Sequence, residues 1–190
     1  MLTLLIVFGA VAVTIGGVLA VLGGAAHLKF LYEQGGEQHW SLLADRVGLL
    51  HGHDDQGRHV LDGSREDIWL HAHAEGSWMV VRGRIDAPLP PTLRITHTRE
   101  RPQRPRLRTG NPILDAHARV EGDTRALTLL EDPDLAGALL AVVHAWPGSH
   151  VDARYVTLRC PDAMGRRLED RCEDVIALVH ALRRAARRTA

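Results

Sequence analysis

An apolar run at the N-terminus constrains the architecture of this chain more than any other feature. Residues 2–26 (LTLLIVFGAVAVTIGGVLAVLGGAA) contain no charged side chain, and Thr3 and Thr14 are their only polar ones. As a helix the run would be about 37 Å long, and the hydrocarbon core of a bilayer is about 30 Å thick. We therefore predict a transmembrane helix over 1–27, a juxtamembrane linker over 28–36 and a soluble domain over 37–190.

A cleaved signal peptide is the alternative interpretation of this run. The GGAA stretch could act as a cleavage site, but a basic start is missing and the apolar run is longer than that of a signal peptide. Lys29, Arg46 and Arg58 are the first basic residues, and all of them follow the run. The segment of a membrane protein that flanks a transmembrane helix on the cytoplasmic side is usually the more basic one. We therefore expect a single-pass protein of the cell membrane whose soluble domain faces the cytoplasm.

One face of the predicted transmembrane helix carries only small residues. They lie four positions apart: Ala12, Gly16, Ala20 and Gly24. This spacing lets a second helix approach closely and favours self-association within the bilayer. Glycine is also frequent in membrane helices, so the same ladder can arise without a partner.

Charge balance and cysteine usage exclude several classes of protein. The 23 basic and 23 acidic residues cancel, so no overall positive field attracts nucleic acid, and we expect no nucleic-acid partner. The two cysteines, Cys160 and Cys172, form no CxxC pair, which excludes a zinc knuckle and a thioredoxin-like site. We expect both to be small buried apolar side chains.

The soluble part begins with a helical pattern and continues with strand patterns. Trp40, Leu43, Ala44 and Val47 recur at helical spacing, and Gly48 suits the end of that helix. Apolar and polar residues then alternate with period two, which is typical of half-buried antiparallel strands. The predicted strands cover 59–63, 67–74, 77–86 and 92–98.

Loops and helices dominate the second half of the predicted domain. Prolines and a glycine predict an extended, arginine-rich loop over 99–112, and a turn with a short strand follows over 113–123. Asp132 and Pro133 suit the start of a helix, and the last helix should run from about 166 to 188. A final strand or hairpin at 152–160 lies between these helices. The order predicts an α+β domain with a mostly antiparallel sheet covered by helices.

Two stretches, TGNPILDAHARVEG and LTLLEDPDLAGALL, resemble a segment of small uncharacterised bacterial proteins with one N-terminal membrane anchor. The segment in those proteins is similar to TG[DN]xx[FL]D followed by a strand and a helix. Asp115 matches that pattern, whereas Asn111 and Leu114 stand where it prefers Asp and Phe. The stretches WSLLADRVGL and PLPPTLRI are also similar to the layout of these proteins. The resemblance implies an anchor followed by an α+β domain, and it implies no catalytic role.

The tract HGHDDQGRH (51–59) contains the residue types of a metal site. His51, His53 and Asp55 match the start of the HxHxDH pattern of zinc-dependent metallo-β-lactamase-like hydrolases, but Gln56 replaces the last histidine. A looser site would use His51, His53, Asp55 and His59. The simpler interpretation is a hairpin connection turned by its glycines, and we expect no metal site there.

Two further groups invite a functional interpretation. His71 and His73 share one face of a predicted strand with Trp69, and a partly covered sheet face accounts for them better than a metal. Five arginines of the loop could contact an anionic lipid or an acidic protein: Arg99, Arg101, Arg104, Arg106 and Arg108. A solvated loop is the alternative.

The sequence contains none of the common catalytic motifs. GxSxG, the P-loop, GxGxxG and HExxH are all missing, so we expect no catalytic and no cofactor-binding residues. The sequence thus favours a membrane-anchored protein with a non-catalytic interaction or structural domain. The alternative is a divalent-metal-dependent enzyme that uses the 51–59 tract.

Overall fold

The computed structural model describes residues 36–101, 103, 105–144, 146–162 and 164–189. The chain divides into two compact units, residues 1–39 and 40–190, and 36–39 are the described part of the first. The predicted transmembrane helix and its small-residue face lie outside the described residues. In the part of the chain that is described, no helix has the length and apolarity needed to cross a membrane.

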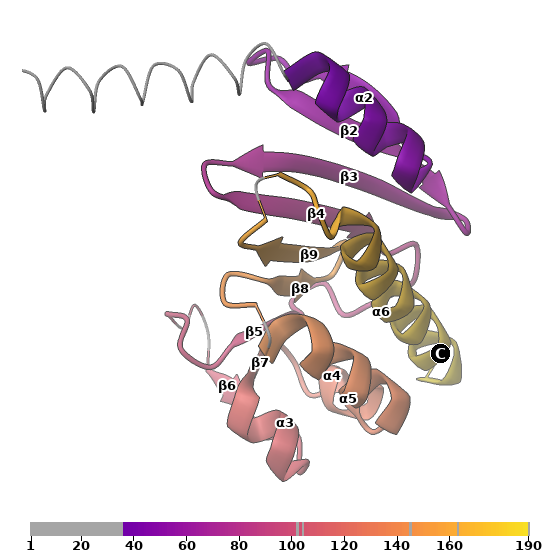
Figure 1. Cartoon of the computed structure of the whole chain (residues 1–190). Coiled ribbons are helices and arrows are strands. Elements are labelled where there is room, and N and C mark those ends of the chain that lie inside the picture. Colours follow the sequence, from indigo (N-terminus) through magenta and orange to yellow (C-terminus); the bar gives the residue numbers. More distant parts are fainter. Residues whose placement is uncertain (1–35, 102, 104, 145, 163, 190) are drawn as a thin grey trace, which may run out of the picture. The chain divides into compact units, whose positions relative to one another are not determined.

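A nine-stranded antiparallel sheet forms the centre of the domain (Figure 1). The strands are β1 (Leu50–His53), β2 (His59–Arg65), β3 (Ile68–Glu75), β4 (Trp78–Arg84), β5 (Arg94–His97), β6 (Arg106–Leu107), β7 (Ala118–Glu121), β8 (His150–Asp152) and β9 (Tyr155–Cys160). Their order is β1-β2-β3-β4-β9-β8-β5-β7-β6. The first four strands form successive hairpins, and β9 joins them to the remaining strands by pairing with β4. The predicted α+β class with a large antiparallel sheet is therefore confirmed.

Helical segments accompany this sheet in the described part of the chain. They are α2 (Gly36–Val47), α3 (Pro112–His117), α4 (Arg125–Leu130), α5 (Pro133–Leu139), a π-helical turn η1 (Leu140–His144) that continues α5, and α6 (Leu168–Thr189). The predicted buried face of α2 is confirmed, and Gly48 ends that helix with a positive φ of 69°. Asp132 caps α5 as expected, because its carboxylate accepts the backbone N–H groups of Asp134 and Leu135.

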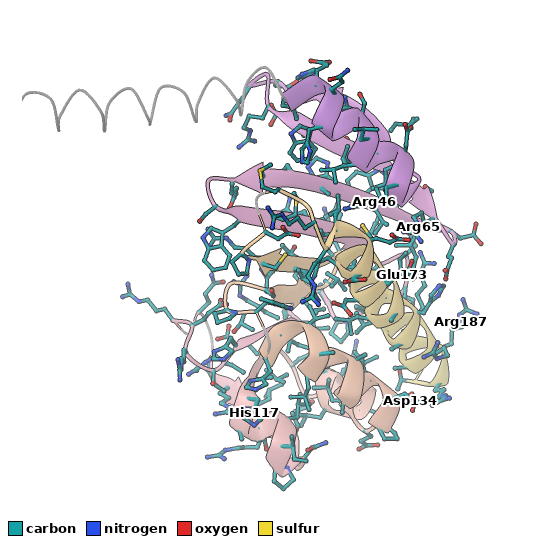
Figure 2. All side chains as sticks on the ribbon, in the orientation of Figure 1. Arg46, Arg65, His117, Asp134, Glu173 and Arg187 are labelled. Atoms are coloured by element: carbon teal, nitrogen blue, oxygen red, sulfur yellow. The ribbon has the colours of Figure 1, made fainter. Side chains whose placement is uncertain are left out.

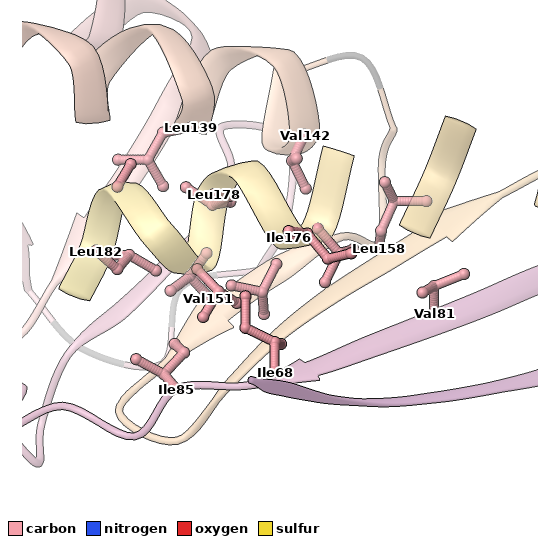
Figure 3. Packing of buried hydrophobic residues seen from close by; sticks show 14 of the residues in the cluster. Ile68, Val81, Ile85, Leu139, Val142, Val151, Leu158, Ile176, Leu178 and Leu182 are labelled. Carbon is pink, nitrogen blue, oxygen red and sulfur yellow. The ribbon is translucent and has the colours of Figure 1, made fainter. Parts of the chain in front are cut away.

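The long helix α6 closes the hydrophobic core against the sheet (Figure 3). Its predicted apolar face is buried, and the residues are Leu168, Cys172, Val175, Ile176, Val179 and Leu182. The facing sheet residues alternate along the strands, as the period-two pattern predicted: Ile68, Leu70 and Ala72 of β3, then Met79 and Val81 of β4. Arg65 of β2 adds an ion pair with Glu173 at the surface of α6 (Figure 2).

Two segments differ from the sequence-based predictions. The predicted turn after residue 112 is the helix α3, because Asn111 accepts the N–H groups of Ile113 and Leu114 and Pro112 starts the helix. The loop predicted over 99–112 contains the short strand β6, which pairs with β7. Arg106 stabilises this pairing, since its guanidinium donates to the carbonyl oxygens of Asp115 and Ala118.

Candidate metal centre

Three histidines of the 51–59 tract converge at the edge of the sheet. The tract forms the β1–β2 hairpin, as the simpler interpretation predicted, and His53 stands directly opposite His59. His51 lies two residues before His53 and therefore on the same face. One ligand nitrogen from each of the three rings lies within 4.8 Å of the other two. The hairpin interpretation and the convergence of potential ligands are thus both true of this tract.

Helix α2 contributes side chains that hold two of these rings. The hydroxyl of Ser41 lies 3.3 Å from Nδ1 of His51, which leaves Nε2 of that ring directed at His59. Nε2 of His51 and Nδ1 of His59 are 3.0 Å apart. The indole of Trp40 is buried and stacks on the ring of His59, with 5.8 Å between ring centroids. His53 is exposed, so the cluster opens to solvent on that side.

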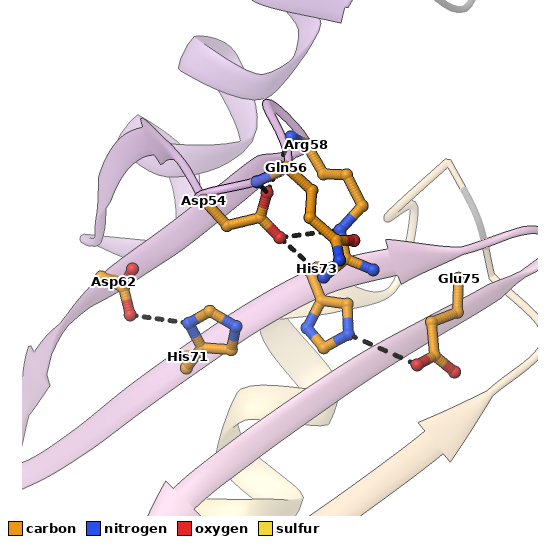
Figure 4. A network of polar contacts seen from close by, with 7 residues as sticks. All are labelled: Asp54, Gln56, Arg58, Asp62, His71, His73 and Glu75. Carbon is orange, nitrogen blue, oxygen red and sulfur yellow. Dashed lines mark hydrogen bonds and ion pairs between the residues drawn. The ribbon is translucent and has the colours of Figure 1, made fainter.

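The turn between the two strands is fixed by Asp54, not by a metal ligand (Figure 4). Its carboxylate accepts the backbone N–H groups of Gln56 and Arg58, both at 2.9 Å, and pairs with the guanidinium of Arg58. The hydrogen bonds from the backbone and side chain of Arg58 lower the pKa of Asp54 to about 2. Asp55 is not part of the converging group. The structure therefore brings together His51, His53 and His59 of the looser four-residue site and leaves Asp55 outside that group.

His71 and His73 lie on the opposite face of the sheet and are held by carboxylates (Figure 4). Nδ1 of His71 is 2.8 Å from Asp62, and Nε2 of His73 is 3.7 Å from Glu75. Burial lowers the pKa of His73, and the neighbouring His71 lowers it further. Among the residues that the structure describes, only the His51, His53 and His59 group gathers three potential ligands.

A third group of histidines was not predicted from the sequence. His97 stacks on His144 at 6.1 Å between ring centroids, and His117 lies 4.0 Å from His144. Burial lowers the pKa of His97, so its neutral form is favoured. Its Nδ1 accepts the backbone N–H of Arg99 and is therefore engaged within the fold. The three residues come from β5, α3 and η1, and no short spacing in the sequence connects them.

Neither cysteine has the surroundings of a nucleophile. Cys160 and Cys172 are free and buried, as predicted. Burial raises the pKa of Cys160 to about 11 and that of Cys172 to about 12. Because the thiolate is the reactive form, burial disfavours nucleophilic attack by either thiol.

The arginines of the predicted loop divide into two kinds. Arg99, Arg101 and Arg108 are exposed, whereas Arg106 donates inward to carbonyl oxygens. Arg104 lies outside the described residues. Among the described arginines of this loop, Arg99, Arg101 and Arg108 are therefore accessible to an anion.

Comparisons of the chain with known proteins identify no related protein. The chain matches no protein-family model, no curated protein and no solved structure. The resemblance to membrane-anchored bacterial proteins therefore stays a prediction.

Proposed function

We propose that the chain is a single-pass protein of the cell membrane that carries a non-catalytic interaction domain. The uncharged run over 2–26 supports the anchor, and the basic residues after it favour a cytoplasmic domain. Two buried free cysteines agree with a reducing compartment. The interaction role rests on the face of the sheet that carries Arg82, which we call the second face, because aromatic and arginine side chains group there.

This second face is identified by the strand register. Gly83 of β4 contacts Val175 of α6, so the odd-numbered residues of β4 face the helix. Arg82 points the other way and lies opposite His71 of β3 and Thr157 of β9. One face of the sheet is thus covered by α6, and the polar face that carries Arg82 lies on the other side.

Aromatic and arginine side chains group on that face. The guanidinium of Arg82 lies over the ring of Tyr155 at 5.9 Å, and the ring of Trp69 meets Tyr155 edge-on at 6.4 Å. Trp69 also stacks on His71 at 5.8 Å. Arg82 is exposed, and the aromatic rings are half-buried. Tryptophan, tyrosine and arginine are the residues that dominate binding at protein interfaces, which supports a protein partner here.

The anchor itself gives the first test. The full-length chain should stay in the membrane fraction after alkaline carbonate washing, because removing an apolar helix from the bilayer exposes its whole surface to water. A chain without residues 1–27 should appear in the soluble fraction. Release of the full-length chain by carbonate would contradict the anchor.

The interaction surface gives the second test. A photo-cross-linking amino acid at Trp69 should yield a discrete adduct with a partner protein when intact cells are irradiated. The matched control places the same amino acid at Leu42, an exposed apolar residue of α2. Identical patterns at the two positions would contradict a specific surface on the second face.

Further contacts follow from the same proposal. Arg99, Arg101 and Arg108 would meet an anionic lipid headgroup or an acidic protein, since exposed guanidinium groups near a bilayer attract negative charge. Ala12, Gly16, Ala20 and Gly24 would allow two anchors to associate.

A divalent-metal-dependent enzyme is the second candidate function. The convergence of His51, His53 and His59 favours it, because catalytic zinc sites use three protein ligands and leave a position open. Metal-dependent turnover that disappears in the His53→Asn variant would support the enzyme over the interaction domain. Binding of an ion without turnover agrees with the interaction domain.

A further inference from the structure

We propose that His51, His53 and His59 bind one zinc ion at the edge of the sheet. The inference goes beyond the interaction function, because it assigns a ligand to a different part of the domain. It is also independent of the anchor, since the three ligands and their supporting residues all belong to the 40–190 unit.

The spacing of the three rings fits a zinc ion. Zinc–nitrogen bonds of about 2.0–2.1 Å in a tetrahedral arrangement place the ligand nitrogens about 3.3 Å apart. Nε2 of His51 and Nδ1 of His59 are already 3.0 Å apart. All three ligand nitrogens lie within 4.8 Å of one another, and His53 is exposed, so its side chain has room to rotate towards the ion.

The donor set selects the class of metal. All three ligands are imidazoles, which suit zinc and other late transition metals, whereas magnesium and calcium prefer oxygen ligands. Three protein ligands leave the fourth tetrahedral position for water. The exposure of His53 gives that position access to solvent.

Helix α2 supplies the support that metal-binding histidines need. The second ring nitrogen of such a histidine usually bonds to a neighbouring group, which fixes the orientation of the ring. Ser41 takes this part at Nδ1 of His51, and Trp40 holds the plane of His59 by stacking. A bound ion would therefore link the edge strand β1 to β2. The side chains of α2 already orient the rings of His51 and His59 that would bind it.

The test measures binding to the untagged full-length chain in mild detergent. Zn²⁺ titrated by calorimetry should saturate at one ion per chain. His53→Asn should weaken the binding by more than about 100-fold, because even outer-sphere partners contribute about 10–100-fold. Ser41→Ala should cost about 10-fold. His180→Asn, a histidine of α6 that pairs with Glu66, is the matched control and should bind as the parent does.

Thermal unfolding and a spectroscopic probe distinguish this site from zinc binding elsewhere on the chain. Zn²⁺ at about 100 times its Kd should raise the Tm of the parent by roughly 5–10 °C and leave the double variant His51→Asn/His53→Asn unchanged. Without metal, the double variant should melt within about 2 °C of the parent, which shows that it folds. Co²⁺ should give a tetrahedral spectrum without a thiolate band.

Three results would overturn the proposal. They are equal Zn²⁺ affinity in the parent and the double variant, saturation at other than one ion, and a cobalt–thiolate band, which would place the ion at a cysteine. Because the readouts are affinity, Tm and absorbance, failure of the zinc site leaves the tests of the anchor and of the second face unaffected.

Discussion

Replacing Ile176 by Ala should destabilise the domain by about 2–5 kcal/mol, a large share of the roughly 5–15 kcal/mol by which a domain is stable. Ile176 lies in the middle of α6 and is only 2% exposed. Figure 3 shows it within the cluster that α6 forms with the sheet, where Leu158 of β9 is also labelled. Truncation would leave a cavity between helix and sheet. Urea unfolding of the full-length chain in mild detergent measures the loss.

Arg184→Ala is the matched control for this prediction. Arg184 lies two turns further along the same helix, and its side chain is exposed. Its removal should change the free energy of unfolding by no more than about 0.5 kcal/mol, because exposed substitutions away from caps and ion pairs usually do so. Similar small effects of both substitutions would show that α6 is peripheral to the core.

The elements that the sequence predicted well are those with a long, regular apolar period. The buried face of α6 repeats over several turns, so its core residues could be read from spacing alone. Strand β3 has eight residues and β4 has seven, and the structure confirms the side of each that the alternation predicted to be buried. In both cases the pattern extends over enough residues to distinguish a period of 3.6 from one of two.

Short elements and long-range pairings could not be predicted in this way. Helix α4 is six residues long, too short for a helical period to be recognised. Strand β6 has two residues and exists because β7 offers it a partner. Strands β4 and β9 are distant in the sequence, yet they pair. The sequence of neither strand indicates which other strand it will pair with.

The candidate site was predictable in part. Hairpin geometry places His53 opposite His59, and strand spacing adds His51 to the same face. The ring orientations depend on Ser41 and Trp40 of α2, and the sequence does not show that this helix packs beside the hairpin. The group of His97, His117 and His144 was missed for a related reason, because packing between distant elements brings these three residues together.

Gly83→Ala should destabilise the domain by about 1–3 kcal/mol, although alanine is normally tolerated better than glycine inside a strand. A Cβ atom at this position would lie 2.5 Å from a methyl group of Val175 and 3.2 Å from one of Val179. Real Cβ contacts essentially never fall below 3.0 Å, so α6 would have to move away from β4. Urea unfolding of the full-length chain measures the cost.

A compensating variant identifies the close approach as the cause. Val175→Ala removes the methyl group that would lie 2.5 Å from the new Cβ, so Gly83→Ala should cost about 1–2 kcal/mol less in that background than in the parent. Gly137→Ala is the matched control, because the same change in α5 meets no atom within 4 Å and should stabilise the chain by about 0.5–1 kcal/mol. The contrary result is that Gly83→Ala lowers the free energy of unfolding equally in the parent and in the Val175→Ala background. That result would show that the close approach of Val175 is not the reason for glycine at this position.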